Sequence, residues 1–165
     1  MVNPFLLDAN ILIQSHRRDY PFDIAPGFWE FLAKLGNEGL IAFPDVILKQ
    51  MIENKDDLSK WMKDNESNFL IYLCSDEVVL SSYGIIINTV QSNNSYKQTA
   101  KAQFASDPDS WLIAVAMAYG LTIVTQEVYE PNCKKKVKIP NECRRHGINY
   151  IDRTEFMRAA NFRWY

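Results

Sequence analysis

The sequence is poor in the side chains that form zinc centres and disulfide frameworks. Its 165 residues include only three cysteines, Cys74, Cys133 and Cys143, and two histidines, His16 and His146. The cysteines are odd in number, form no Cys-x-x-Cys pair and have no histidine at zinc-site spacing. We therefore expect no zinc site, and we expect a reduced, cytoplasmic protein.

The chain also lacks a long hydrophobic run. Its longest nearly apolar stretch, residues 111–124, contains Gly120 and Thr122 and is shorter than the roughly 20 residues of a membrane span. The first residues contain neither a basic leader nor a cleavage-site pattern, so we expect no secretory signal. These features predict a protein without a membrane segment.

Charge of one sign is not in excess. The formal net charge is −2, which argues against a protein coated in positive potential for indiscriminate nucleic-acid binding but leaves room for a local basic patch. Apolar residues make up 47% and charged residues 23%, values typical of folded globular proteins. The length fits one domain over residues 1–165.

Apolar segments and turn signals predict alternating strands and helices. We expect strands at 2–7, 40–43, 69–73, 121–125 and 149–151. We expect helices from residue 11 and at 28–35, 47–52, 58–62, 107–118, 141–146 and 154–161. In the helix at 107–118, Asp107 is expected as the N-cap and Pro108 as the first helical residue. The segment 75–106 is hard to assign, with an apolar stretch at 78–90 and an expected exposed loop at 91–95. This alternation predicts an α/β fold with a mostly parallel central sheet between two layers of helices.

Three carboxylates stand where apolar segments end. Asp8 follows the first expected strand, Glu127 follows the fourth, and Asp109 opens a helix. Ligands of parallel α/β sheets bind beyond the carboxyl ends of the strands, so these acids are candidates for one shared site. Each also has an ordinary structural role: Asp8 as a turn or cap residue, Asp109 as a partner of the helix dipole, and Glu127 as a solvated loop acid.

The residues around these acids resemble the three main motifs of the PIN-domain ribonucleases. The motifs are Leu-Leu-Asp-Ala-Asn-Ile at 6–11, Asp-Ser-Trp-Leu-Ile-Ala at 109–114 and Val-Thr-Gln-Glu at 124–127. Within that superfamily, Leu-Ser-Lys-Trp at 58–61 and Lys-Ile-Pro-Asn-Glu-Cys at 138–143 resemble the branch known as DUF4411. The resemblance implies a compact, three-layer α/β/α sandwich that hydrolyses phosphodiesters with a divalent metal.

The same resemblance implies the ligands and partners. Asp8, Asp109 and Glu127 would be the catalytic acids and the metal ligands, and oxygen-only ligands favour Mg²⁺ or Mn²⁺. The substrate would be RNA, and the protein would be the toxin of a toxin–antitoxin pair, restrained by a cognate antitoxin. A homodimer is a further implication of the resemblance.

One acid of the PIN-domain pattern is missing. The position aligned with the fourth acid, on the helix after the second strand, holds the neutral Gln50. Glu53, about one helical turn away, and Asp45, at the start of that helix, are candidates to compensate. If neither does, the alternative is a catalytically impaired PIN-like module that binds RNA or a protein partner.

Further residues have candidate supporting roles. Thr125 and Asn10 could hydrogen-bond ligating carboxylates or metal-bound water, although strand packing and turn formation explain them equally well. The only dense basic segment follows Glu127 and could hold an RNA backbone, or it could be a solvated loop. Its residues are Lys134, Lys135, Lys136, Lys138, Arg144 and Arg145.

Overall fold

A computed structural model describes residues 3–164, whose strands form one parallel sheet. The strand order is β3-β2-β1-β4-β5, and every neighbouring pair is parallel. The strands are β1 (Phe5–Leu7), β2 (Ile41–Pro44), β3 (Leu70–Tyr72), β4 (Thr122–Val124) and β5 (Tyr150–Ile151). The predicted α/β fold is confirmed, and all five expected strands are present. Val2, the expected start of the first strand, lies outside the described residues.

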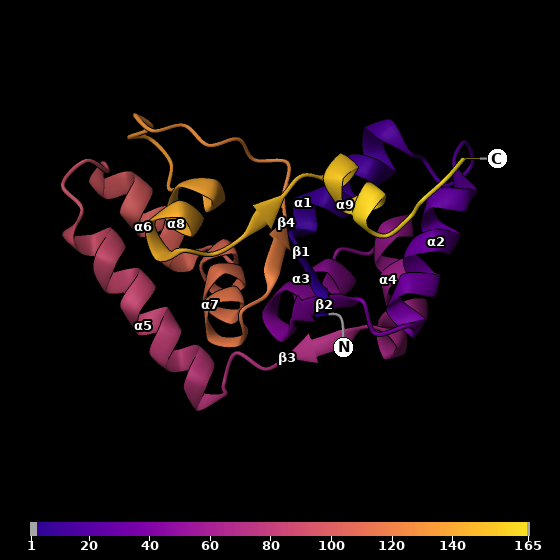
Figure 1. Cartoon of the computed structure of the whole chain (residues 1–165), viewed down its shortest axis with the longest axis horizontal. Coiled ribbons are helices and arrows are strands. Elements are labelled where there is room, and N and C mark those ends of the chain that lie inside the picture. Colours follow the sequence, from indigo (N-terminus) through magenta and orange to yellow (C-terminus); the bar gives the residue numbers. More distant parts are fainter. Residues whose placement is uncertain (1–2, 165) are drawn as a thin grey trace.

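Helices cover both faces of this sheet. Figure 1 shows α5, α6, α7 and α8 on one side of the strands and α2, α4 and α9 on the other, which gives the predicted three layers. The helices are α1 (Ala9–Gln14) with a following π-helical turn (Ser15–Asp19), α2 (Pro26–Asn37), α3 (Asp45–Glu53), α4 (Asp57–Asn65) with a 3-10 turn (Glu66–Asn68), α5 (Glu77–Ser92), α6 (Gln98–Ser106), α7 (Asp109–Tyr119), α8 (Ile139–His146) and α9 (Arg153–Ala159). No helix within residues 3–164 is long and apolar enough to cross a bilayer.

The inner strands are apolar because both of their faces are covered. Leu6 and Leu7 of β1, Phe43 of β2 and Val124 of β4 are fully buried. The edge strand β3 differs, with the Leu70 side chain partly open to solvent. The buried central strands therefore fix the position of the loops that follow their carboxyl ends.

The segment that was hard to assign from sequence contains two helices. Its first half forms α5, whose Tyr83 ring stacks on Trp111 of α7 with centroids 3.8 Å apart. The loop expected at 91–95 is wrong in its first two residues, because α5 continues to Ser92. The second half forms α6, which ends where the chain turns into α7.

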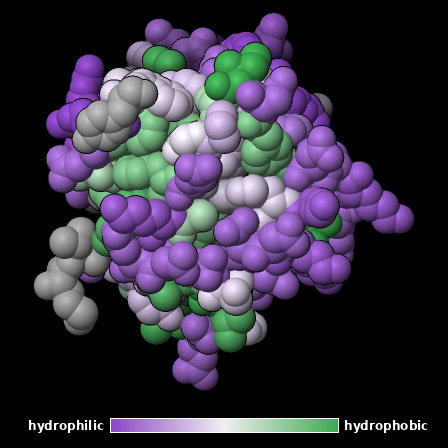
Figure 2. Space-filling view, turned by 90° about the vertical axis from the view of Figure 1, so that its right-hand side faces the viewer, coloured by the Kyte–Doolittle hydropathy of each residue, from purple (hydrophilic) through white to green (hydrophobic). Residues whose placement is uncertain are grey.

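The C-terminal segment returns to the α2 side of the molecule. Phe162 packs on Phe31 of α2 with ring centroids 4.8 Å apart, and Trp164 lies 5.7 Å from the Tyr20 ring. Figure 2 shows this side, where hydrophilic side chains surround a smaller group of hydrophobic ones. The chain end is therefore packed against α2 and the segment that precedes it.

The position of a candidate site follows from the strand order. β1 lies between β2 and β4, so the chain winds outward in opposite directions from the β1/β4 pair. Such a switch point leaves a crevice beyond the carboxyl ends of the two strands, where ligands of parallel sheets bind. The Asp8 amide donates to the Val124 carbonyl at 3.0 Å, which keeps these two strand ends together.

Candidate active site

Asp8 lies directly beyond β1, at the switch point. The residue is 1% exposed, and its carboxylate accepts two hydrogen bonds. Oδ1 accepts from the Asn10 amide at 3.2 Å, which caps α1, and Oδ2 accepts from the Thr125 hydroxyl at 3.0 Å. Asp8 thus has the ordinary capping role and also lines a cavity. Asn10 lines the same cavity, and its hydrogen bond to Asp8 comes from its backbone amide.

Thr125 connects the end of β4 to two acidic residues. Its hydroxyl donates to Asp8 and accepts from the Glu127 amide at 3.1 Å. With 1% of its surface exposed, this hydroxyl is shielded from water. It therefore fixes the orientation of Asp8 and the direction in which the chain leaves β4.

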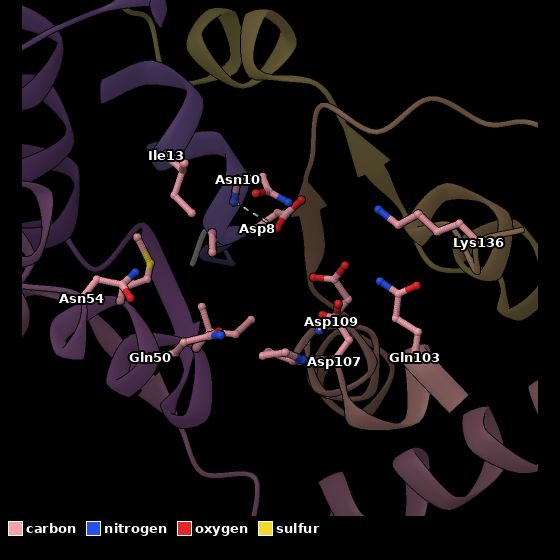
Figure 3. A pocket seen from close by; sticks show the side chains of 13 residues that line it. Asp8, Asn10, Ile13, Gln50, Asn54, Gln103, Asp107, Asp109 and Lys136 are labelled. Atoms are coloured by element: carbon pink, nitrogen blue, oxygen red, sulfur yellow. Dashed lines mark hydrogen bonds between the residues drawn. The ribbon is translucent and has the colours of Figure 1, made fainter. Parts of the chain in front are cut away.

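Asp109 stands in the first turn of α7 and faces the cavity beside Asp8 (Figure 3). Its amide donates to Asp107 Oδ1 at 2.9 Å, the hydrogen bond expected of a capping aspartate, although the N-cap position of the regular helix is Pro108 and its first residue is Asp109, each one residue later than predicted. Asp107 also lines the cavity. Its second carboxylate oxygen has no hydrogen-bond donor among the described residues, so the helix cap brings a further acid to the site.

Glu127 lies at the edge of this group rather than in the cavity lining. Its Oε1 accepts from the Ile139 amide, the first residue of α8, at 3.1 Å, and its Oε2 lies 3.3 Å from Lys136 Nζ. Only 12% of the Glu127 side chain is exposed. Glu127 thus contacts both the N-terminus of α8 and the Lys136 ammonium.

The opposite wall of the cavity comes from α3. The cavity has a volume of about 250 Å³, and Figure 3 shows Gln50 and Asn54 across it from Asp109 and Lys136. Gln50 therefore stands at the site, as its alignment predicts, and supplies a neutral amide. Asn54, the C-cap of α3 about one turn further along, also supplies a neutral amide.

Neither acid proposed to compensate for Gln50 reaches this wall. Glu53 is exposed on α3 but does not line the cavity, because it is rotated away from the face that carries Gln50 and Asn54. The Asp45 carboxylate accepts from the Val46 and Cys74 amides at 2.9 and 3.1 Å and so fastens the start of α3 to the end of β3. In this structure, neither carboxylate therefore takes the place of Gln50 in the cavity wall.

The basic segment does not form one continuous surface. Lys136 is the one member that lines the cavity, while Lys138 pairs with Glu130 at 3.0 Å. Arg144 stacks on the Tyr129 ring at 3.8 Å. Arg145 pairs with the buried Glu142 at 3.3 Å, and Lys134 and Lys135 are exposed on the loop.

Burial changes the acidity of the two cavity acids. Desolvation raises the pKa of Asp8 to about 6, and the Glu127 charge adds to this, while donation from Asn10 and Thr125 acts in the opposite direction. Desolvation and the neighbouring charges of Asp8, Asp107 and Glu127 raise the pKa of Asp109 to about 8. A cation that favours the ionised forms would remove this conflict.

The donor chemistry fits a hard divalent cation. All the acids here offer oxygen ligands, which Mg²⁺ and Mn²⁺ prefer, and the two buried aspartates gain most from a positive charge. Across residues 3–164, no three side chains of the His, Cys, Asp and Glu types already lie close enough together to enclose an ion. Lys136 supplies the nearest positive charge instead.

Sequence reasoning missed three polar residues of the cavity as site residues. Asp107 was assigned only a capping role, and Gln103 belongs to α6, in the segment that was hard to assign. Asn54 could have been found, since it lies four residues after Gln50 and hence on the same helix face. Gln103 had no such signal.

Comparisons with known proteins agree with this architecture. The family model described as Domain of unknown function (DUF4411) matches residues 5–164. A crystal structure of VapBC2 from Rickettsia felis, bound to a DNA fragment from their promoter, contains a chain with a similar structure. It has 13% sequence identity and a TM-score of 0.56, and the match covers 90% of this chain and 97% of that one. At this identity the similarity shows the fold alone. A comparison with curated proteins found no match.

Proposed function

Because this chain belongs to the DUF4411 family and has a PIN-like fold, we propose that it is a metal-dependent phosphodiester hydrolase, an endoribonuclease that serves as the toxin of a toxin–antitoxin pair. One observation carries the proposal. Asp8 and Asp109 come from sequence positions about a hundred residues apart and line one cavity at the switch point of the sheet, with Glu127 beside them. Ordinary capping does not require these acids to converge.

The acids would hold the metal, and the surrounding residues would position them. Asp8, Asp109 and Glu127 are the proposed ligands of Mg²⁺ or Mn²⁺, and Asp107 is a further oxygen donor at the same cavity. When bound, such an ion would activate water and offset negative charge on the phosphate. Thr125 would keep the Asp8 carboxylate oriented through its hydrogen bond, and burial of both groups would exclude competing water.

The polar residues that line the cavity are better suited to binding an RNA backbone than a small anion. Lys136 offers one positive charge, while Asn10, Gln50, Asn54 and Gln103 offer neutral amides that bind phosphate, ribose or base edges. The exposed Lys134 and Lys135 would extend the positive surface beyond the cavity. The predicted RNA contact of Lys138, Arg144 and Arg145 requires that these side chains leave their present partners or bind RNA while still paired with them.

A second candidate function is a catalytically impaired module that binds RNA or a protein partner. The observation in its favour is Gln50, which presents an amide at the position of the fourth acid, with no replacement from Glu53 or Asp45. Loss of that acid weakens a two-ion arrangement first and leaves a one-ion site with three acids.

The proposed partner is a cognate antitoxin. The structural neighbour VapBC2 was solved bound to a DNA fragment from their promoter. A partner protein of this chain would cover the acidic rim and so block RNA. A homodimer and a cytoplasmic location stay predictions.

The test is cleavage of labelled single-stranded and structured RNAs in Mg²⁺ or Mn²⁺. Wild-type protein is compared with Asp8→Asn and Asp109→Asn, and with Asp64→Asn, an exposed acid of α4, as the matched control. We expect metal-dependent cleavage by wild type and the control, with a loss of at least about a hundredfold in the two site variants. Equal behaviour of all four proteins at high enzyme concentration would favour the binding module.

A further inference from the structure

One positive side chain stands among the acids of the site. Lys136 Nζ lies 3.3 Å from Glu127 Oε2, and Figure 3 shows its amine pointing toward Asp8 and Asp109. Burial alone would lower the pKa of Lys136, but the charges of Glu127, Asp109 and Asp107 raise it. The ammonium therefore lies beside two of the proposed metal ligands, Glu127 and Asp109.

The loop that carries Lys136 is fixed on both sides of this residue. The Lys97 amide donates to the Lys134 carbonyl at 3.0 Å, and the next side chain along the loop, Val137, is buried. The Ile139 amide then donates to the other oxygen of Glu127 at 3.1 Å. Packing thus directs the lysine toward the acids, whereas a solvated lysine of a free loop would have no such constraint.

We propose that Lys136 is an internal counter-ion of the acidic cluster: it competes with the divalent cation for Glu127, and its ammonium pairs with a backbone phosphate instead when RNA binds. This inference rests on the proposed function, since it needs a metal and an RNA substrate at the same site. It assigns one residue two roles with opposite effects: Lys136 weakens metal binding in the free protein and strengthens substrate binding.

The competition follows from the geometry of Glu127. This carboxylate has two oxygens, one used by the α8 amide and the other by Lys136, so a cation can reach it only by displacing the ammonium or by sharing its oxygen. A phosphate brought to the cavity offers the displaced ammonium a new partner. RNA and metal would therefore each favour the binding of the other, as linkage requires.

The test measures two quantities that should move in opposite directions. Lys136→Met should bind Mn²⁺ about tenfold more tightly by calorimetry without RNA, since one nearby positive charge is removed. Its KM for a labelled RNA should rise about tenfold, since one phosphate contact is lost. Lys136→Arg retains the charge and should bind Mn²⁺ with wild-type affinity. Lys63→Met removes an exposed charge from α4, away from the proposed RNA-binding residues, and is the matched control for both quantities.

The outcomes separate this inference from the proposed function. Equal Mn²⁺ affinity of wild type and Lys136→Met would overturn the inference and leave the nuclease assignment standing. Tighter Mn²⁺ binding by Lys136→Arg, or an unchanged KM for Lys136→Met, would also overturn it. If none of the proteins binds Mn²⁺, the inference and the metal-dependent function both fail. Thermal melting of each variant, followed by circular dichroism, checks that it is folded.

Discussion

Asp109→Asn should make the metal-free protein more stable at alkaline pH. The substitution keeps the shape of the side chain but removes a carboxyl group whose pKa is raised to about 8 by burial and by its acidic neighbours. Because this pKa lies above the unfolded value, the folded state holds the extra proton. Wild-type stability is therefore lost as the pH rises from the unfolded pKa toward the folded one.

The size of the effect follows from the two pKa values. An unfolded aspartate has a pKa of about 3.9, so between pH 5 and pH 8 it is ionised, while folded Asp109 stays largely protonated. Each pH unit in this window costs about 1.4 kcal/mol of unfolding free energy. Three units give an upper bound of about 4 kcal/mol. Asp8 titrates in the same range. We therefore expect the difference in unfolding free energy between variant and wild type to grow by about 2 to 4 kcal/mol from pH 5 to pH 8.

Urea unfolding at pH 5, 6.5 and 8 in EDTA measures this difference. The control Asp64→Asn removes an equal charge from an exposed helix position and should parallel wild type across the range. Added Mn²⁺ should stabilise wild type at pH 8 and leave Asp109→Asn nearly unchanged, because ligand binding to the folded state adds stability. Parallel pH profiles of wild type and Asp109→Asn would refute this reasoning, since they would show that the pKa of Asp109 is not raised in the folded state.

Two further substitutions test the walls of the cavity. Gln50→Glu should restore a fourth acid, tighten Mn²⁺ binding by about tenfold and raise kcat for RNA; unchanged affinity would show that this position does not face the ion. Thr125→Val removes the hydroxyl that donates to Asp8, so the pKa of Asp8 should rise above about 6. Calorimetry should then show several-fold weaker Mn²⁺ binding at pH 6.5 and nearly normal binding at pH 8.5, whereas an equal loss at both values would indicate a packing defect.

The strand-end acids were predictable because local sequence fixes their position. An apolar run followed by Asp8, and another followed by Thr125 and Glu127, place these side chains beyond two strands whatever the details of the helices. The capping role of Asp107 was readable for the same reason, from the Asp-Pro pair ahead of α7. Its place in the cavity was not, since that depends on how α7 packs against β2 and β4.

The apolar residues of the middle segment do not recur at a clear helical spacing. On α5, Val79 and Ile86 are buried while Val78 and Ile85 are more than half exposed, so apolar residues occur on both faces and no amphipathic stripe appears. Gln103 was missed as a consequence.

Long-range contacts account for the remaining differences. Asp45 is occupied by the amide of Cys74, 29 residues away, and neighbouring basic residues pair with separate partners on the loop and on α8. Neither arrangement follows from the spacing of residues along the chain.

The most direct test of the metal-dependent site is anomalous scattering from a crystal soaked in Mn²⁺ at about pH 8, where Asp8 and Asp109 are more fully ionised. We predict a peak in contact with the carboxylates of Asp8 and Asp109, with Lys136 Nζ displaced from Glu127, and no such peak in crystals of Asp109→Asn. Crystals of wild type that show no peak at these acids in millimolar Mn²⁺, with Lys136 still paired to Glu127, would contradict a metal-dependent active site at this position.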